Sequence, residues 1–173
     1  MRFFWMIAST AVCAVLAGCG HGHDDDAIHA GQTQSAAVDV LTPPANPNDF
    51  GAWRAFIGKV ILAETHDANA HPYTFIVPAG DSDESKDTRK SMATAIHGYI
   101  GNTAVPENMV VLTGPESDKV AQVIVDAFGD LPARSAEGLV VMYVGVPQAA
   151  TKAQGALRAT GAQFRMKAMR ASS

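Results

Sequence analysis

Hydrophobic residues occur in two kinds of run along the chain from residue 49 onward. Continuous runs of β-branched, aliphatic and aromatic residues, such as 109–112 and 139–146, are typical of strands in a sheet that is covered on both faces. In the stretches between them, apolar residues return every three or four positions, which is the spacing of a helix that buries one side. The alternation of the two kinds predicts successive βαβ units.

The limits of each element follow from turn residues and from the ends of each apolar run. The predicted strands are 73–77, which lies between Pro72 and Pro78, then 109–113, 139–146 and 164–168. The first two predicted helices are 49–64 and one that contains the apolar residues of 92–100 and ends at Gly101-Asn102. The other two are a helix over 120–128 that ends near Gly129 and a weaker helix over 149–159. The first helix has Asp49 as its N-cap and Phe50, Trp53, Ile57, Val60 and Ile61 at helical spacing.

Together these elements predict a single α/β domain over 49–173. We expect a small, mostly parallel sheet of about four strands with helices on its faces, joined by right-handed crossovers. The helix 49–64 should pack on one face, with Trp53 as a packing residue. In the last strand Arg165 and Lys167 alternate with apolar residues, which predicts a half-exposed strand at a sheet edge.

The amino-terminal stretch follows a different pattern. Arg2 supplies a positive charge, and residues 3–16 form an apolar segment within the roughly 7–15 residue range of secretory signals. This segment is too short to cross a bilayer of about 30 Å as a helix, which takes about 20 apolar residues. Small residues follow it, and then Cys19.

The motif Leu16-Ala17-Gly18-Cys19 resembles the lipobox of bacterial lipoproteins. The resemblance implies that residues 1–18 are a signal peptide, and that Cys19 becomes the first mature residue with a diacylglycerol thioether and an N-acyl chain. Each buried methylene contributes roughly 0.8 kcal/mol, so several chains make a permanent anchor. In this class Gly20 in place of Asp favours the outer membrane of a Gram-negative host, and we expect the domain to face the periplasm. The alternative is an ordinary signal peptide that is cleaved elsewhere, with Cys19 a free thiol.

Composition limits the possible partners and the source of stability. The 173 residues include only two cysteines, Cys13 in the signal and Cys19, so no disulfide can form within one mature chain. The net charge of −4 becomes −5 when Arg2 leaves with the signal. A mildly acidic chain without a Lys/Arg cluster argues against nucleic acid or anionic lipid as a partner.

Residues 19–48 read as the lipidated cysteine and a flexible tether, because they are polar and lack a periodic apolar face. Prolines within 43–47 predict a stiff spacer near its end. His21, His23 and His29, with the aspartates at 24–26, have the side-chain types that bind Zn, Ni or Cu. A flexible strand of ligands fixes no coordination geometry, so the alternative is an ordinary polar spacer.

Acidic residues gather in the loops that follow the first two strands of the predicted sheet. These residues, called the acidic rim below, are Asp81, Asp83, Glu84, Glu116 and Asp118. Ligands of open α/β sheets bind beyond the carboxyl ends of the strands, so the rim is a candidate site for a solute or a divalent cation. The same carboxylates would repel a phosphate, and the phosphate-binding glycine motifs are lacking. Their structural alternative is to stabilise helix N-termini.

The sequence offers no positive sign of catalysis. It has no GxSxG elbow and no cysteine nucleophile, and His97 lies next to an apolar helix side. We therefore expect a protein that is not an enzyme and has no cofactor: a lipid-anchored interaction or assembly module with an envelope protein partner, for instance an accessory to a secretion or other transenvelope machine. The alternative is a solute- or metal-binding lipoprotein that uses the acidic rim or the His/Asp tether.

The lipobox generates the first testable prediction. Mass spectrometry of the protein from its native membrane should find an amino-terminal Cys19 whose sulfur carries diacylglycerol. The protein should also sediment with intact envelopes. An unmodified thiol on Cys19, or recovery in the soluble fraction, would contradict the resemblance.

Overall fold

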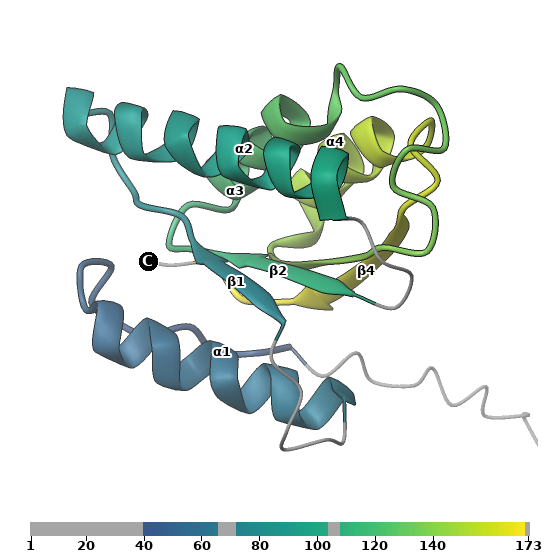
Figure 1. The fold of residues 1–173 in the computed structure, drawn as a ribbon. Coiled ribbons are helices and arrows are strands. Elements are labelled where there is room, and N and C mark those ends of the chain that lie inside the picture. The colour runs from purple at the N-terminus through teal and green to yellow at the C-terminus, as the bar shows by residue number, and fades with distance from the viewer. Residues whose placement is uncertain (1–39, 66–71, 104–107, 172–173) are drawn as a thin grey trace, which may run out of the picture. The chain divides into compact units, whose positions relative to one another are not determined.

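The computed structural model describes residues 40–65, 72–103 and 108–171. In these ranges helices and strands alternate as the sequence predicts, and the α/β class is confirmed (Figure 1). The helices are α1 (Phe50–Thr65), α2 (Asp83–Thr103), α3 (Ser117–Phe128) and α4 (Pro147–Leu157). The strands are β1 (Tyr73–Ile76), β2 (Met109–Thr113), β3 (Val140–Gly145) and β4 (Gln163–Ala168). None of these helices is long and apolar enough to cross a membrane.

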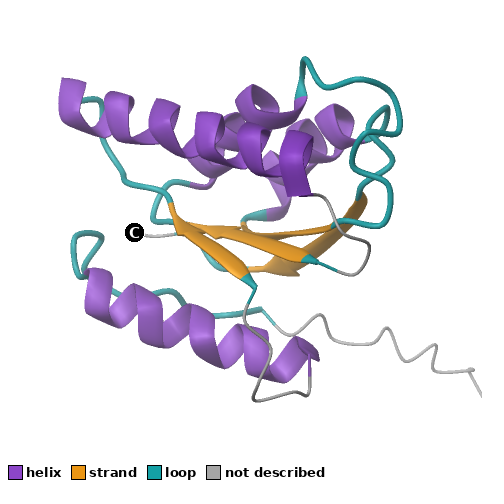
Figure 2. Ribbon diagram, in the orientation of Figure 1, coloured by secondary structure: helices purple, strands orange, loops and turns teal. Residues whose placement is uncertain are grey.

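The four described strands form one parallel sheet in the order β1-β2-β3-β4. Each strand pairs with the next one along the chain, so every crossover steps in the same direction. Crossovers of one hand then place their helices on the same face. Figures 1 and 2 show α2, α3 and α4 above the sheet and α1 below it. The fold is a three-layer arrangement in which the central strands are covered on both sides.

Alternate residues of the two central strands supply both cores. Val110, Leu112 and Val141 belong to the larger cluster beneath α2, α3 and α4, whereas Val111 and Met142 belong to a smaller cluster with α1. All five side chains are fully excluded from solvent. Burial of each large apolar side chain stabilises the fold by about 1.5–3 kcal/mol, which accounts for the continuous apolar runs of these strands.

Helix α1 begins where the sequence predicts. The Asp49 carboxylate accepts a hydrogen bond from the Ala52 N–H at 2.9 Å, which confirms Asp49 as the N-cap. Trp53 is fully buried, and its ring meets Phe56 edge-on at 5.7 Å between centroids. Phe50 differs from the expectation for the apolar side, since it remains 51% exposed in the first turn.

Several boundaries differ from the sequence pattern. Helix α2 continues through Gly101 and Asn102 to Thr103 instead of ending at this pair. Helix α4 begins at Pro147, two residues earlier than predicted, because the fixed φ of proline suits the first turn of a helix and costs no hydrogen bond there. Leu41, which the pattern places in the tether, is hydrogen-bonded to the end of the sheet. Its N–H donates to the Ala168 carbonyl, and its carbonyl accepts from the Arg170 N–H, both at 2.9 Å.

The two edge strands therefore differ in character. β4 lies at an edge, as predicted, and it carries Arg165 and Lys167, the latter paired with Glu64 of α1 at 2.5 Å. Leu41 covers its last residues. β1 has the sequence Tyr-Thr-Phe-Ile with no charged residue. Charges, covering segments, prolines and short length are common protections of a sheet edge. β4 has the first two, whereas β1 is a strand of four residues between Pro72 and Pro78.

Gly114 provides a test of how tightly the loops close at the carboxyl end of the sheet. A Cβ at this position would lie 2.4 Å from the Val77 carbonyl oxygen, which is main chain and cannot rotate away. We expect Gly114→Ala to lower the free energy of unfolding by about 1–3 kcal/mol in urea denaturation. The matched control is Gly155→Ala on α4, where no atom apart from the adjoining backbone of the same helix lies within 4 Å of the added Cβ. The control should be more stable by about 0.5–1 kcal/mol, and an equal loss in both variants would contradict the close approach.

Candidate functional site

The loops at the carboxyl ends of β1, β2 and β3 meet, as a parallel sheet requires. The Gly80 N–H in the first loop donates to the Glu116 carboxylate in the second at 2.7 Å. The Val146 N–H in the third loop donates to the Ser117 hydroxyl at 2.9 Å. The loops are thus joined into one rim through internal hydrogen bonds.

Asp81 is the best-connected member of the acidic rim. Its carboxylate forms an ion pair with Lys119 and lies 3.6 Å from the Arg89 guanidinium. Arg89 also donates to the carbonyl oxygens of Pro78 and Gly80 at 3.0 and 2.8 Å. The hydrogen bond from Lys119, and then its positive charge, lower the pKa of Asp81. This part of the rim is arranged as a tie between loops.

The other rim carboxylates do not converge on Asp81. Asp83 is almost fully solvated and lies 3.6 Å from Lys86. Glu84 borders one cavity and Asp118 another. Among the residues that the structure describes, no group of three or more His, Cys, Asp or Glu side chains could hold a metal ion. The remaining candidates Cys19, His21, His23 and His29 lie outside the described residues.

His97 makes a contact between two helices. Its Nδ1 lies 3.1 Å from the Ala127 carbonyl oxygen of α3. A carbonyl can only accept, so this nitrogen carries the proton in the hydrogen-bonded tautomer. The contact gives His97 a packing role between α2 and α3. His66 and His71, which flank Asp67, lie outside the described residues.

The rim has one hollow of about 190 Å³, between the loops that follow β2 and β3, but the strand order places no topological switch point there. In open α/β sheets the ligand crevice forms where neighbouring crossovers leave the sheet toward opposite faces. Of the described helices, α2, α3 and α4 lie on one face and α1 lies on the other. The helices diverge only at the outer side of β1, which passes between α1 and α2. That outer side is the candidate site that sequence reasoning missed.

The outer side of β1 presents unpaired main-chain groups. The Val77 N–H donates to the Thr113 carbonyl of β2 at 2.8 Å, so Val77 and Phe75 direct their main-chain groups toward β2. Because these groups alternate along a strand, those of Thr74 and Ile76 point away from the sheet. No main-chain partner for them occurs in the described part of the chain. We call this side, with its flanking side chains, the β1 edge.

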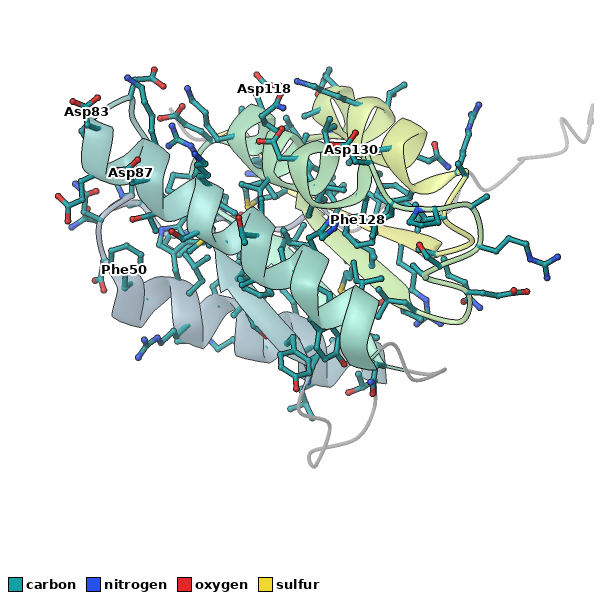
Figure 3. All side chains as sticks on the ribbon, turned by 45° about the horizontal axis from the view of Figure 1, so that its top comes forward. Phe50, Asp83, Asp87, Asp118, Phe128 and Asp130 are labelled. Atoms are coloured by element: carbon teal, nitrogen blue, oxygen red, sulfur yellow. The ribbon has the colours of Figure 1, made fainter. Side chains whose placement is uncertain are left out.

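Three hollows line the β1 edge. One of about 220 Å³ lies between Phe50 at the start of α1 and Met92 of α2, and an adjoining one of about 340 Å³ contains Arg54 and Thr74. A third, of about 140 Å³, is lined by apolar and aromatic side chains that include Tyr73. Figure 3 shows Phe50 at the start of α1, beside the first turns of α2 that carry Asp83 and Asp87.

The side of α2 that borders the β1 edge is uncharged beyond its first turn. Beyond Glu84 in the first turn, the side chains that line the hollows from this helix, which we call the α2 ridge, are Ser85, Thr88, Met92, Ala95, Ile96 and Tyr99. The ring of Tyr99 lies 4.3 Å from that of Tyr73, which is 53% exposed. Burial is the main cause that raises the pKa of Tyr99. The ridge and the strand together form an aromatic, uncharged surface.

Comparison with known proteins adds no relative to this description. Neither a model of a protein family, nor a curated protein, nor a solved structure matches the chain. The features on which a function can be based are therefore the anchor motif, the acidic rim and the β1 edge.

The Asp81–Lys119 pair generates a prediction about acid stability. The pKa of Asp81 is lowered from its ordinary value of 3.8, so the folded state binds fewer protons than the unfolded state. The stabilisation is therefore complete above about pH 4 and is lost as the pH falls through the lower, folded-state pKa. We expect Lys119→Met to lower the melting temperature slightly at neutral pH, with a difference from wild type that disappears as the pH falls through the folded-state pKa of Asp81.

The control for this prediction is Lys152→Met. Lys152 donates to the uncharged side chain of Gln122, so the effect of its removal should not follow the protonation of a carboxylate. Melting temperatures of the three proteins across the acid range provide the measurement. A Lys119→Met difference that stays constant with pH would contradict the role of Asp81.

Proposed function

We propose that this chain is a lipid-anchored envelope protein that acts as a non-enzymatic interaction module in the periplasm, with the β1 edge as its binding surface. The observation that carries the proposal is an uncharged edge strand whose Thr74 and Ile76 main-chain groups lack partners in the described chain. Extended segments bind such edges by adding a strand, with main-chain hydrogen bonds for affinity and side-chain pockets for specificity. The hollows beside Phe50 and Tyr73 are such pockets.

The anchor motif supports the same proposal from the other end of the chain. Lipidation at Cys19 would confine the domain to one membrane surface through the tether predicted for residues 19–48, in which Leu41 is hydrogen-bonded to the end of the sheet. The roughly 20 residues between Cys19 and Leu41 would span roughly 25 Å on average as a flexible chain. Such confinement raises the effective concentration of the domain near other envelope proteins without any catalytic group. A place in a secretion or other transenvelope assembly is consistent with this arrangement.

The rival proposal of a solute- or metal-binding lipoprotein gains less support. The best-placed rim carboxylates, Asp81 and Glu116, have Lys119, Arg89 and the Gly80 N–H as internal partners. Binding a cation there would have to replace these contacts.

The test is site-specific photo-crosslinking in native membranes with the full chain. A benzophenone amino acid in place of Tyr73, at the β1 edge, should yield discrete protein adducts. The same probe in place of Gln154, exposed on α4, should not. Combining the Tyr73 probe with Cys19→Ser should reduce adduct formation at least about tenfold, because the local concentration is lost. Equal labelling from both positions, or none from Tyr73, would overturn the proposal.

A further inference from the structure

The open hydrogen-bonding groups of the β1 edge form a small and symmetric set. Pro72 and Pro78 flank the strand, each three residues from Phe75, and neither has an N–H. Their carbonyl oxygens already have partners: the Thr74 hydroxyl donates to that of Pro72 at 3.2 Å, and Arg89 donates to that of Pro78 at 3.0 Å. Two donors and two acceptors remain, all belonging to Thr74 and Ile76.

This set is complementary to itself. If a second β1 runs antiparallel with Phe75 opposite Phe75, the Thr74 N–H and C=O meet the C=O and N–H of the second copy's Ile76. The two strands are related by a two-fold axis, which generates the same pair between Ile76 of the first copy and Thr74 of the second. All the open groups of both strands therefore have partners. We propose that the β1 edge is a self-association surface, and that two copies of this chain join their sheets through β1. The inference deepens the proposed function, on which it rests, by naming the partner as a second copy.

The side chains on the axis suit this pairing. Phe75 lies at a position without main-chain hydrogen bonds to the second copy, where opposite side chains approach most closely. The two Phe75 rings meet on the α2 side of the sheet, next to the 140 Å³ hollow lined by Tyr73 and Tyr99. Aromatic pairs across neighbouring strands stabilise a sheet beyond the area that they bury.

The charges around the edge also permit a second copy. In the proposed dimer, in which the two sheets join through β1, the α2 ridges of the two copies face each other. The ridge contains no charged residue, so the two ridges do not repel each other. The charged groups bordering the hollows, Arg54 and Glu84, have opposite signs. At the far edge of the sheet, Arg165 and Lys167 would face like charges, and Leu41 covers the end of β4. Self-pairing is therefore favoured at β1 and opposed at β4.

A cysteine pair tests the register. Cys19 is acylated and Cys13 removed if the lipobox is processed, so an introduced cysteine is the only free thiol of the mature full chain. Phe75→Cys in native membranes should give a disulfide-linked dimer under mild oxidation, because position 75 lies on the axis. Tyr73→Cys is the matched control, since its two copies would lie roughly 14 Å apart. Disulfides need Cα atoms within about 7 Å, so this variant should stay monomeric in the same gel.

A proline substitution tests the hydrogen bonds without breaking the fold. Thr74→Pro removes an N–H that points away from β2, and edge strands tolerate proline with that orientation. Thr74→Val is its control. Both variants lose the hydrogen bond from the Thr74 hydroxyl to the Pro72 carbonyl, but only Thr74→Pro also loses the main-chain N–H. With the full-length protein in detergent, sedimentation should show that Thr74→Pro raises the dimer dissociation constant at least about tenfold over Thr74→Val. Circular dichroism should show that both variants keep the fold.

Dimers that form equally well with Thr74→Pro and Thr74→Val, or equal linkage from positions 73 and 75, would overturn the inference. Photo-crosslinks from Tyr73 to a different protein, without self-linkage at position 75, would overturn it and leave the proposed function standing. A lack of any Tyr73 adduct together with no linkage at position 75 would overturn both.

Discussion

The structure depends on one requirement: a parallel sheet exposes apolar residues on both faces, and both faces must be covered. Leu112 and Val141 meet this requirement on one face, and Val111 and Met142 on the other. Three crossover helices cover the first face because each connects neighbouring strands in the same direction. Of the described helices, only α1 covers the second face, where its Ile57 and Val60 close the smaller core and Leu41 packs against it. Without α1 the apolar side of the central strands would be in water.

The same strand order determines where the molecule can interact. The described strands follow one another across the sheet in chain order, so no switch point, where ligands of open α/β sheets usually bind, lies between them. The loops at the carboxyl ends are joined to each other by contacts such as those of Asp81 with Lys119 and of Val146 with Ser117. The positions that remain open to a partner therefore lie at the two edges of the sheet. Of the two end strands, β4 is charged and partly covered, and β1 is uncharged and open.

The anchor and the domain contribute different parts of the proposed function. A lipid chain on Cys19 would provide location and a high local concentration, but no selectivity. Selectivity would come from the β1 edge, where Pro72 and Pro78 restrict pairing to a short strand and the hollows near Phe50 and Tyr73 accept side chains. A weak, short edge contact is sufficient when both partners are held at one membrane surface.

The sequence by itself determined the order and type of the elements, the N-cap at Asp49 and the two-sided burial of β2 and β3, because these depend on local periodicity and on side-chain chemistry within a few residues. It also supplied the motif Leu16-Ala17-Gly18-Cys19, whose resemblance to a lipobox depends on four consecutive residues. Only the tertiary structure decided that β1 is an open edge, that α2, α3 and α4 share the face opposite α1, and that Asp81 has Lys119 as its partner. The sequence Tyr-Thr-Phe-Ile is equally compatible with a central strand and with an edge strand. Its neighbours come from residues more than thirty positions away, and local patterns carry no information about which strands pair.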